Sequence, residues 1–282
     1  MTNDQLKNLQ LKANNIRQDI LISTHAAKSG HPGGSLSVAD YFAYLYNVEM
    51  NVDPKNPKWE DRDRFVLSKG HCAPVLYATL AEKGFFPVED LKTLRKHGSY
   101  LQGHPNMNLT PGVDMSTGSL GQGISTACGM AKGAKFLEKD FRVYTLLGDG
   151  ELAEGQVWEA TMFAAHYKLD NLCIAVDVNG LQIDGATKDV MNTEPLDKKF
   201  EAFGCHVVKI DGHDFHALEN AFTTFHKTKN KPTVILLQTI KGKGVSYMEN
   251  VVGWHGKAPN DDQLKIALAE LESARKKIEE AA

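Results

Sequence analysis

The chain has 282 residues, of which 42% are hydrophobic; this is enough for one large α/β domain or two smaller ones and excludes a disordered or fibrous protein. Its 32 Lys and Arg residues against 35 Asp and Glu give a formal net charge of −3, so we expect no bulk attraction to nucleic acid or to an acidic membrane surface. The first 18 residues are polar and periodic and lack the apolar run of a secretory signal or a membrane span, which predicts a cytoplasmic protein.

The first predicted elements are two helices joined by a loop. Apolar side chains recur at steps of three and four residues, at Leu6, Leu9, Ala13, Ile16 and Ile20. This spacing predicts an amphipathic helix that runs toward Gly30, where Gly30 and Pro32 stop it. A glycine-rich loop is expected over residues 29–34. Residues 37–46 predict a second helix whose aromatic side chains belong to the core.

From about residue 142 the pattern changes to short apolar runs that alternate with helix-like stretches, as in βαβ units. The predicted strands are VYTLL at 143–147, NLCIAVDV at 171–178, CHVVKI at 205–210 and TVILLQTI at 233–240. The predicted helices cover 153–167, 194–203, a segment capped by Asp214, and a charged tail over 261–282. Buried parallel strands read as nearly continuous apolar runs, so the sequence predicts an α/β fold with a parallel sheet and helices on both faces.

Glycine-containing segments directly follow three of the predicted strands, at residues 148–150, 179–181 and 241–244. Ligands of parallel sheets bind at the carboxyl ends of the strands. The two glycines around Asp149 allow a close backbone approach to a ligand. The segment lacks the G-x-G-x-x-G spacing of a dinucleotide site, and the carboxylate would repel a pyrophosphate unless a cation lay between them.

A magnesium ion resolves this conflict because it takes oxygen ligands and commonly bridges protein groups to a diphosphate. Asn179 closes the next predicted strand, 30 residues after Asp149, and offers a second oxygen ligand. The backbone carbonyl of Leu181 could offer a third. Taken alone, Asn179-Gly180 is more simply a turn.

Other metal and redox sites are weaker hypotheses. The sequence has no H-E-x-x-H motif, and His213 and His216 lack further zinc ligands nearby. The four cysteines are far apart in apolar segments, which predicts reduced, buried thiols.

The GDG segment followed by VDVNG resembles the signature of thiamine-diphosphate enzymes, in which Asp, Asn and a backbone carbonyl hold Mg²⁺ on the cofactor diphosphate. Further segments resemble transketolases, in the same order and over nearly the whole chain. They are SGHPGGSLSVAD, DRFVLSKGHCAPVLYATL, LQGHP, STGSLGQGISTACGMA, LLGDGELAEGQVWEA and KGKGVSYMENVVGWHGKAP. The resemblance implies that residues 1–282 form the thiamine-diphosphate- and Mg²⁺-binding domain of a transketolase.

The resemblance also implies roles for individual residues. Asp149, Asn179 and the Leu181 carbonyl match the ligands of Mg²⁺, for which Ca²⁺ or Mn²⁺ can substitute. The residues matched to cofactor binding are His71, Gly118, Ser119, Leu120, Gly150, Glu154, Asn179 and Lys241, with Glu154 lying where paired halves meet. The histidines matched to catalysis are His31, His71, His104 and His255.

The chemistry of ketol transfer suits these histidines. A ketose donor bound to a thiazolium must lose a hydroxyl proton before its carbon–carbon bond breaks, and the acceptor aldehyde oxygen must gain one. Imidazoles perform both transfers near neutral pH. A lone histidine would more often be structural, and His25, His97, His166, His206 and His226 are expected to be ordinary.

The resemblance implies a second polypeptide. In thiamine enzymes a separate pyrimidine-binding domain supplies the activating glutamate, and in transketolases it also supplies the arginines that bind substrate phosphate. We expect that domain on a C-terminal partner subunit in an α₂β₂ assembly acting on sugar phosphates. The first alternative is a related ketol transferase, either one for sulfo- or deoxysugar phosphates or one that forms dihydroxyacetone. The others are 1-deoxyxylulose-5-phosphate synthase, the α subunit of a 2-oxoacid dehydrogenase, and a noncatalytic thiamine-diphosphate-binding protein.

Overall fold

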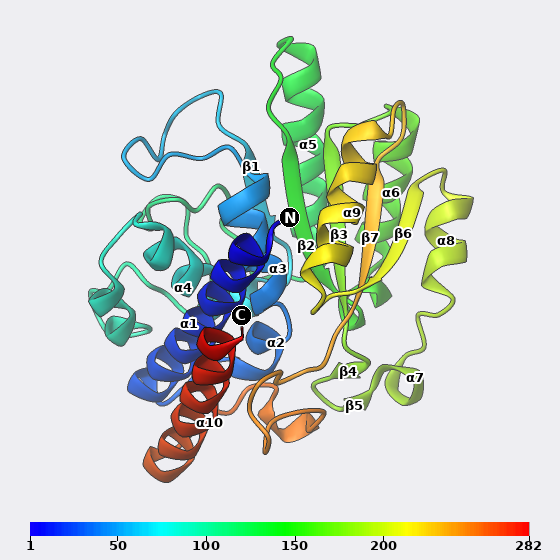
Figure 1. Ribbon diagram of the computed structural model, residues 1–282. Helices are drawn as coiled ribbons and strands as arrows, with labels where there is room; N and C mark the ends of the chain where they lie inside the picture. Colours follow the sequence, from blue (N-terminus) through cyan, green and yellow to red (C-terminus); the bar gives the residue numbers. More distant parts are fainter. Residues whose placement is uncertain (282) are drawn as a thin grey trace.

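The computed structural model describes residues 1–281 and is built around one five-stranded sheet (Figure 1). The strands are β1 (Arg64–Leu67), β2 (Val143–Gly148), β3 (Leu172–Val178), β6 (His206–Asp211) and β7 (Thr233–Gln238). Their order is β1-β2-β3-β7-β6, and every neighbouring pair is parallel. Because all strands run the same way, all their carboxyl ends lie at one edge of the sheet.

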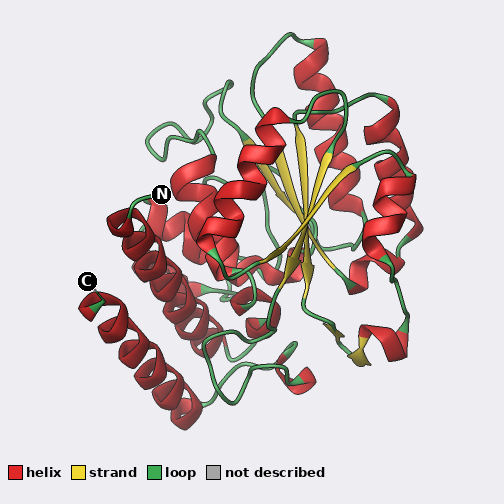
Figure 2. Ribbon diagram, turned by 45° about the vertical axis from the view of Figure 1, so that its right-hand side comes forward, coloured by secondary structure: helices red, strands yellow, loops and turns green. Residues whose placement is uncertain are grey.

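Both faces of the sheet are buried under helices (Figure 2). Successive strand residues point to opposite faces; in β3, Cys173 and Ala175 belong to one core, and Leu172, Ile174 and Val176 belong to the other. The first core lies against α1 (Asn3–Ala27), α3 (Ala39–Tyr44), α4 (Ala73–Lys83), α9 (Phe215–Lys227) and α10 (Asp261–Glu280). The second lies against α5 (Gln122–Phe136), α6 (Gly155–His166) and α8 (Leu196–Ala202). The predicted α/β fold with helices on both faces is confirmed.

The N-terminal part of the chain differs from the sequence prediction in three places. The first helix ends at Ala27, and Lys28 is in the left-handed conformation, so the helix stops before Gly30. The prediction of a loop over residues 29–34 is wrong from Pro32 onward, because α2 (Pro32–Leu36) begins with Pro32, a residue suited to the first helical position. The single helix expected over 37–46 is α3 followed by a π-helical turn over Leu45–Glu49.

The remaining elements lie close to their expected positions, with one strand missed. β1 was not predicted, because it has only four residues and lies between charged and polar segments. The helix expected over 153–167 is a 3-10 turn over Gly150–Ala153 followed by α6. Asp214 caps α9 as predicted, because its side chain accepts a hydrogen bond from the His216 amide at 2.8 Å. The tail helix ends at Glu280, and residue 282 lies outside the described part.

The segment between β3 and α8 lies outside the five-stranded sheet. It contains β4 (Leu181–Gln182) and β5 (Gly185–Ala186), which pair antiparallel, and α7 (Thr187–Val190). Figure 1 shows it at the carboxyl end of β3. All four cysteines are free and buried, as predicted. Among residues 1–281, no helix is long and apolar enough to cross a membrane.

Candidate active site

The carboxyl ends of four adjacent strands meet at one pocket. Lys69 follows β1, Asp149 follows β2, Asn179 follows β3 and Lys241 follows β7. Their side chains line a pocket of ≈ 320 Å³. The segments at 148–150, 179–181 and 241–244 therefore meet at one pocket, as predicted. Lys69, at the end of β1, lines the same pocket.

Asp149 is held in a fixed orientation by backbone amides. Its Oδ1 accepts a hydrogen bond from the Gly150 amide at 2.8 Å, and its Oδ2 accepts one from the Gly180 amide at 2.6 Å. Burial, and then the nearby negative charge of Asp177, raise the pKa of Asp149 to about 6. A cation placed against this carboxylate would relieve both effects.

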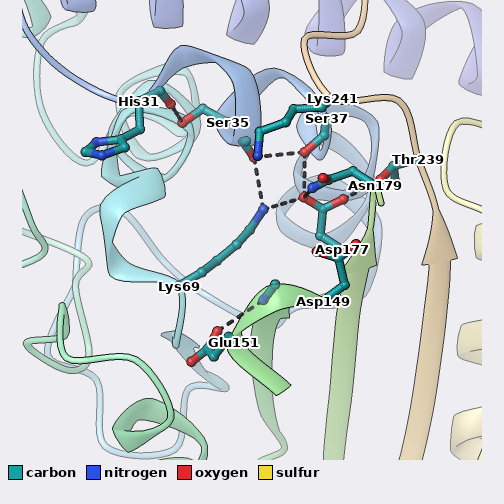
Figure 3. A network of polar contacts seen from close by, with 12 residues as sticks. His31, Ser35, Ser37, Lys69, Asp149, Glu151, Asp177, Asn179, Thr239 and Lys241 are labelled. Carbon is teal, nitrogen blue, oxygen red and sulfur yellow. Dashed lines mark hydrogen bonds and ion pairs between the residues drawn. The ribbon is translucent and has the colours of Figure 1, made fainter. Parts of the chain in front are cut away.

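Lys69, which lines the pocket, forms a buried ion pair with Asp177 (Figure 3). The Lys69 ammonium donates to Asp177 Oδ2 at 2.6 Å and to the Gly34 carbonyl at 2.9 Å. Asp177 also accepts hydrogen bonds from Ser37 Oγ at 2.6 Å and from the Thr239 hydroxyl. Despite complete burial, these donors hold the pKa of Asp177 below its usual value.

The same carboxylate orients Asn179. Asn179 Nδ2 donates to Asp177 Oδ2 at 2.8 Å, which turns Asn179 Oδ1 the other way, where it accepts from the Leu181 amide at 3.1 Å. The carbonyl oxygen of Leu181 accepts a hydrogen bond from Lys241 Nζ at 2.8 Å. The two predicted ligands after β3 are thus ordered by hydrogen bonds within the site.

These groups fit a magnesium ion and a diphosphate. A carboxylate, an amide oxygen and a backbone carbonyl are the hard oxygen ligands that Mg²⁺ prefers, and Asp149, Asn179 and Leu181 all line the pocket. The buried Gln182 Oε1 in the same pocket has no hydrogen-bond partner, so a further polar group can be received there. Among the described residues, no group of three or more His, Cys, Asp or Glu side chains is arranged to hold a metal ion, and this includes the surroundings of His213 and His216.

Three of the four predicted catalytic histidines form one cluster at the pocket. The ring centroids of His31, His71 and His255 lie 5.2 to 5.5 Å apart in each pair. Burial, assisted by neighbouring cationic groups, lowers the pKa of His31 and of His71 to about 4 and that of His255 to about 3. All three rings are therefore neutral at pH 7.

The Nδ1 atoms of His255 and His31 differ in their hydrogen bonding. His255 Nδ1 lies 2.9 Å from Lys241 Nζ and accepts its hydrogen bond. His31 Nδ1 is buried and has no hydrogen-bond partner. A ring nitrogen without a partner at a pocket wall can contact a bound molecule.

His104 lies at the edge of the cluster. Its side chain is exposed and packs beside Gly118, where an added Cβ atom would lie 3.0 Å from the imidazole ring. Its backbone carbonyl accepts a hydrogen bond from the Tyr77 hydroxyl at 3.0 Å. Gly118 has φ +155°, so this position requires glycine both for its backbone and for the ring beside it.

The other predicted cofactor residues divide into two groups. Gly118, Leu120 and Gly150 line the pocket together with His71, Asn179 and Lys241. Ser119 and Glu154 lie outside the pocket lining. Glu154 directly precedes α6 as its N-cap residue, and its side chain packs against Gly121.

Glu151, which the sequence interpretation overlooked, ties two of these loops together. Its carboxylate accepts hydrogen bonds from Ser68 Oγ at 2.5 Å and from the amides of Gly121 and Gly148 at 2.8 and 3.1 Å. Lys69 and Asp177 were overlooked as well. A carboxylate inside the apolar run Leu172–Val178 is itself a signal, because a buried charge requires a partner. No sequence signal identifies Lys69 as that partner.

A parallel α/β sheet with a carboxylate, lysines and neutral imidazoles around a pocket at its strand ends defines an α/β protein whose pocket suits an anionic ligand. The model of the family described as "Transketolase, thiamine diphosphate binding domain" matches residues 9–277. The chain belongs to this family as an N-terminal, thiamine-diphosphate-binding chain, so the predicted resemblance is confirmed.

Individual relatives agree with this assignment. Over 269 residues the chain is 47% identical to the 6-deoxy-6-sulfo-D-fructose transketolase subunit SqwG of a Clostridium species, covering 95% of this chain and 98% of that protein. It is 41% identical over 275 residues to a subunit of the apulose-4-phosphate transketolase of Phocaeicola vulgatus, covering 98% of both. The crystal structure of transketolase from Campylobacter jejuni superposes with a TM-score of 0.88 at 32% identity, covering 99% of this chain and 46% of that one.

Proposed function

We propose that the chain is the N-terminal subunit of a transketolase that transfers a two-carbon ketol unit from a ketose phosphate to an aldose phosphate. The observation that carries this proposal is the cluster of His31, His71 and His255, which lies in the same pocket as the oxygen ligands at residues 149, 179 and 181. A site that bound only a diphosphate would have no use for three neutral imidazoles.

In this proposal Asp149, Asn179 and the Leu181 carbonyl hold Mg²⁺, and Lys241, Gly150 and His71 face the cofactor diphosphate. When bound, thiamine diphosphate supplies the nucleophilic carbon and the electron sink that ketol transfer requires. Gly118, Ser119 and Leu120 contact its pyrimidine end. Ca²⁺ or Mn²⁺ can replace Mg²⁺ because the ligands are all oxygen atoms.

The histidines move protons and hold sugar hydroxyls. His31 Nδ1 has no hydrogen-bond partner in the protein. In this proposal it accepts a hydrogen bond from a substrate hydroxyl. Neutral imidazoles accept the proton of a donor hydroxyl and return a proton to the aldehyde oxygen of the acceptor. Lys241 keeps His255 Nδ1 as an acceptor, so the proton that His255 handles is on Nε2.

The proposal includes a C-terminal partner subunit that carries the pyrimidine-binding domain. Two relatives are named as subunits, and the chain covers 98% of the length of each. By contrast, it covers only 46% of the transketolase chain from Campylobacter jejuni. Two copies of each chain would form an α₂β₂ assembly, with Glu154, the residue before α6, near the contact. A cytoplasmic location is part of the same proposal.

Two classes of sugar are candidates for the donor. The names of the relatives include 6-deoxy-6-sulfo-D-fructose and apulose 4-phosphate, so a modified sugar is the alternative to an ordinary ketose phosphate. Donor competition in the reconstituted enzyme distinguishes them: the natural donor has the highest kcat/KM and suppresses transfer from the others.

A noncatalytic thiamine-diphosphate-binding protein is the candidate from another class, and cofactor affinity separates it from the enzyme. We expect the chain alone to bind thiamine diphosphate with Mg²⁺ weakly, because the pyrimidine-binding domain that would hold the other end of the cofactor is on the partner. Calorimetric titration with and without the partner, with Asp149→Ala as the control for the site, measures this. If the chain alone binds the cofactor tightly and the partner does not change the affinity, the proposal of an enzyme subunit would be contradicted.

A further inference from the structure

His213 lies in the turn between β6 and α9, where the sequence suggested no function beyond an incomplete zinc site. Its side chain is 13% exposed, and both ring nitrogens have partners. Nδ1 lies 2.8 Å from Asp40 Oδ2, and Nε2 accepts a hydrogen bond from the Ile240 amide at 3.0 Å. Because an amide can only donate, Nε2 is unprotonated and Nδ1 carries the proton that it donates to Asp40.

Arg17 of α1 completes this arrangement. Its guanidinium donates to both oxygens of Asp40, at 3.0 and 2.5 Å, and the two side chains are 10% and 8% exposed. Its Nε also donates to the Lys243 carbonyl at 3.2 Å. Gly244 has φ +92°, and an added Cβ atom there would lie 3.0 Å from the Arg17 side chain, so the segment passes directly against Arg17.

The segment 240–244 is therefore held at two points: His213 accepts from the Ile240 amide, and Arg17 donates to the Lys243 carbonyl. Asp40 links the two side chains that make these contacts. Lys241 lies between those points. Its Nζ contacts the Leu181 carbonyl at 2.8 Å and His255 Nδ1 at 2.9 Å. The distance of Lys241 from both groups depends on where the backbone of the segment is held.

We infer that His213 is a positioning residue, which with Asp40 and Arg17 fixes the segment 240–244 so that Lys241 reaches both the Leu181 carbonyl and His255. The inference about the segment is independent of the reaction; its consequence for cofactor binding rests on the proposed function. The geometry favours this role over general support of the fold, because the ring's two hydrogen bonds lead to Asp40 and to the segment itself.

The test uses two substitutions that separate the two ring nitrogens. His213→Asn keeps an amide near the position of Nδ1 and removes the acceptor for Ile240. His213→Gln places an amide oxygen near the position of Nε2 and keeps that acceptor. His216→Asn is the matched control, because His216 lies in the same turn and is 56% exposed.

Amide hydrogen exchange of the full chain without cofactor is the first measurement. We expect exchange at Ile240 to rise about tenfold in His213→Asn, as for the loss of one hydrogen bond. In His213→Gln and His216→Asn it should stay within about threefold of the wild type. Unchanged exchange at Ile240 in His213→Asn, or an equal rise throughout β6, β7 and α9, would overturn the positioning role.

The second measurement is the thiamine diphosphate concentration that half-saturates the enzyme reconstituted with its partner. We expect this KM to rise about tenfold in His213→Asn, with kcat at saturating cofactor within about twofold of the wild type, and His213→Gln to restore the KM. An unchanged KM despite faster exchange would overturn the link from the segment to the site. Absence of activity in the wild-type complex would contradict the proposed function and leave the exchange result to decide the positioning role.

Discussion

The ammonium nitrogen of Lys69 lies 2.6 Å from Asp177 Oδ2, and the side chains are 2% and 0% exposed. The pair joins the end of β1 to the end of β3, two strands that are separated in the sheet by β2. Lys69 lines the same pocket as the residues proposed to hold the metal, and the Asp177 carboxylate orients one of them, Asn179. The ion pair therefore supports the site as well as the fold.

Lys69→Met should destabilise the protein by about 3–5 kcal/mol, because it leaves the Asp177 carboxylate buried without its cation. Lys135→Met is the matched control. Lys135 is 2.6 Å from Asp170, but this pair is much more exposed, and its loss should cost less than about 1 kcal/mol. Urea unfolding at pH 7 measures both. Equal effects of the two substitutions would show that burial does not decide the value of the Lys69–Asp177 pair.

Asp149→Ala should abolish metal-dependent activity of the reconstituted enzyme and binding of thiamine diphosphate in the presence of Mg²⁺. The carboxylate is the only charged group among the three proposed ligands, so its removal leaves two neutral oxygens. Chelation of Mg²⁺ from the wild type should have the same effect, and added Mg²⁺ should reverse it. Metal-dependent activity and cofactor affinity that persist in the variant would count against the site.

Substitution of His31, His104 or His255 by Ala should lower turnover or donor affinity, on the order of 10²-fold where proton transfer is lost. Thiamine diphosphate should remain bound, because these rings are proposed to act on the sugar. His97→Ala, which changes an exposed histidine away from the pocket, is the control. A collapse of the melting temperature in the His31, His104 or His255 variants would instead assign them a structural role.

Asp19→Asn should stabilise the protein at pH 8 by on the order of 2 kcal/mol and have little effect at pH 4. Burial, together with the charge of Glu82, raises the pKa of Asp19 to about 7, and its Oδ2 has no hydrogen-bond partner. The folded state thus binds the proton more tightly than the unfolded state, so the stability it brings is present at low pH and is lost as pH rises through about 7. Urea unfolding at the two pH values measures this effect.

The exposed Asp4 of the same helix provides the control, since Asp4→Asn changes no buried carboxylate and should not stabilise the protein at pH 8. A destabilisation by Asp19→Asn at pH 8 would show that the carboxylate form is favoured in the folded protein.

The sequence predicted β2, β3 and β7 because these strands are buried on both faces and form continuous apolar runs. It also predicted β6, a half-exposed strand at the edge of the sheet, from the apolar residues around Val207 and Val208. It did not predict β1, whose four residues carry too short a pattern. Asp149 and Asn179 could be placed at the same edge from their positions after two strands. The Lys69–Asp177 pair could not, since its partners are 108 residues apart and only the packed sheet brings them together.

The same reasoning explains what was missed around the histidines. Glycine-rich segments indicated that His31, His71 and His255 lie in loops, but their mutual distances depend on three different connections. Glu151 was overlooked because its acceptor role is visible only when the amides of Gly121 and Gly148 are both placed around it. Hydrogen bonds between distant backbone groups leave no pattern in the sequence.

The chain is proposed to be one half of a split ketol transferase, and reconstitution tests this proposal. The experiment mixes it with a purified C-terminal transketolase subunit, Mg²⁺, thiamine diphosphate, a ketose phosphate donor and an aldose phosphate acceptor, and measures the transfer product and the mass of the complex. We predict no transfer by this chain alone, transfer by the mixture, and a mass corresponding to two copies of each chain. Robust transfer by this chain alone, at a mass that contains only its own copies, would contradict the split-enzyme proposal.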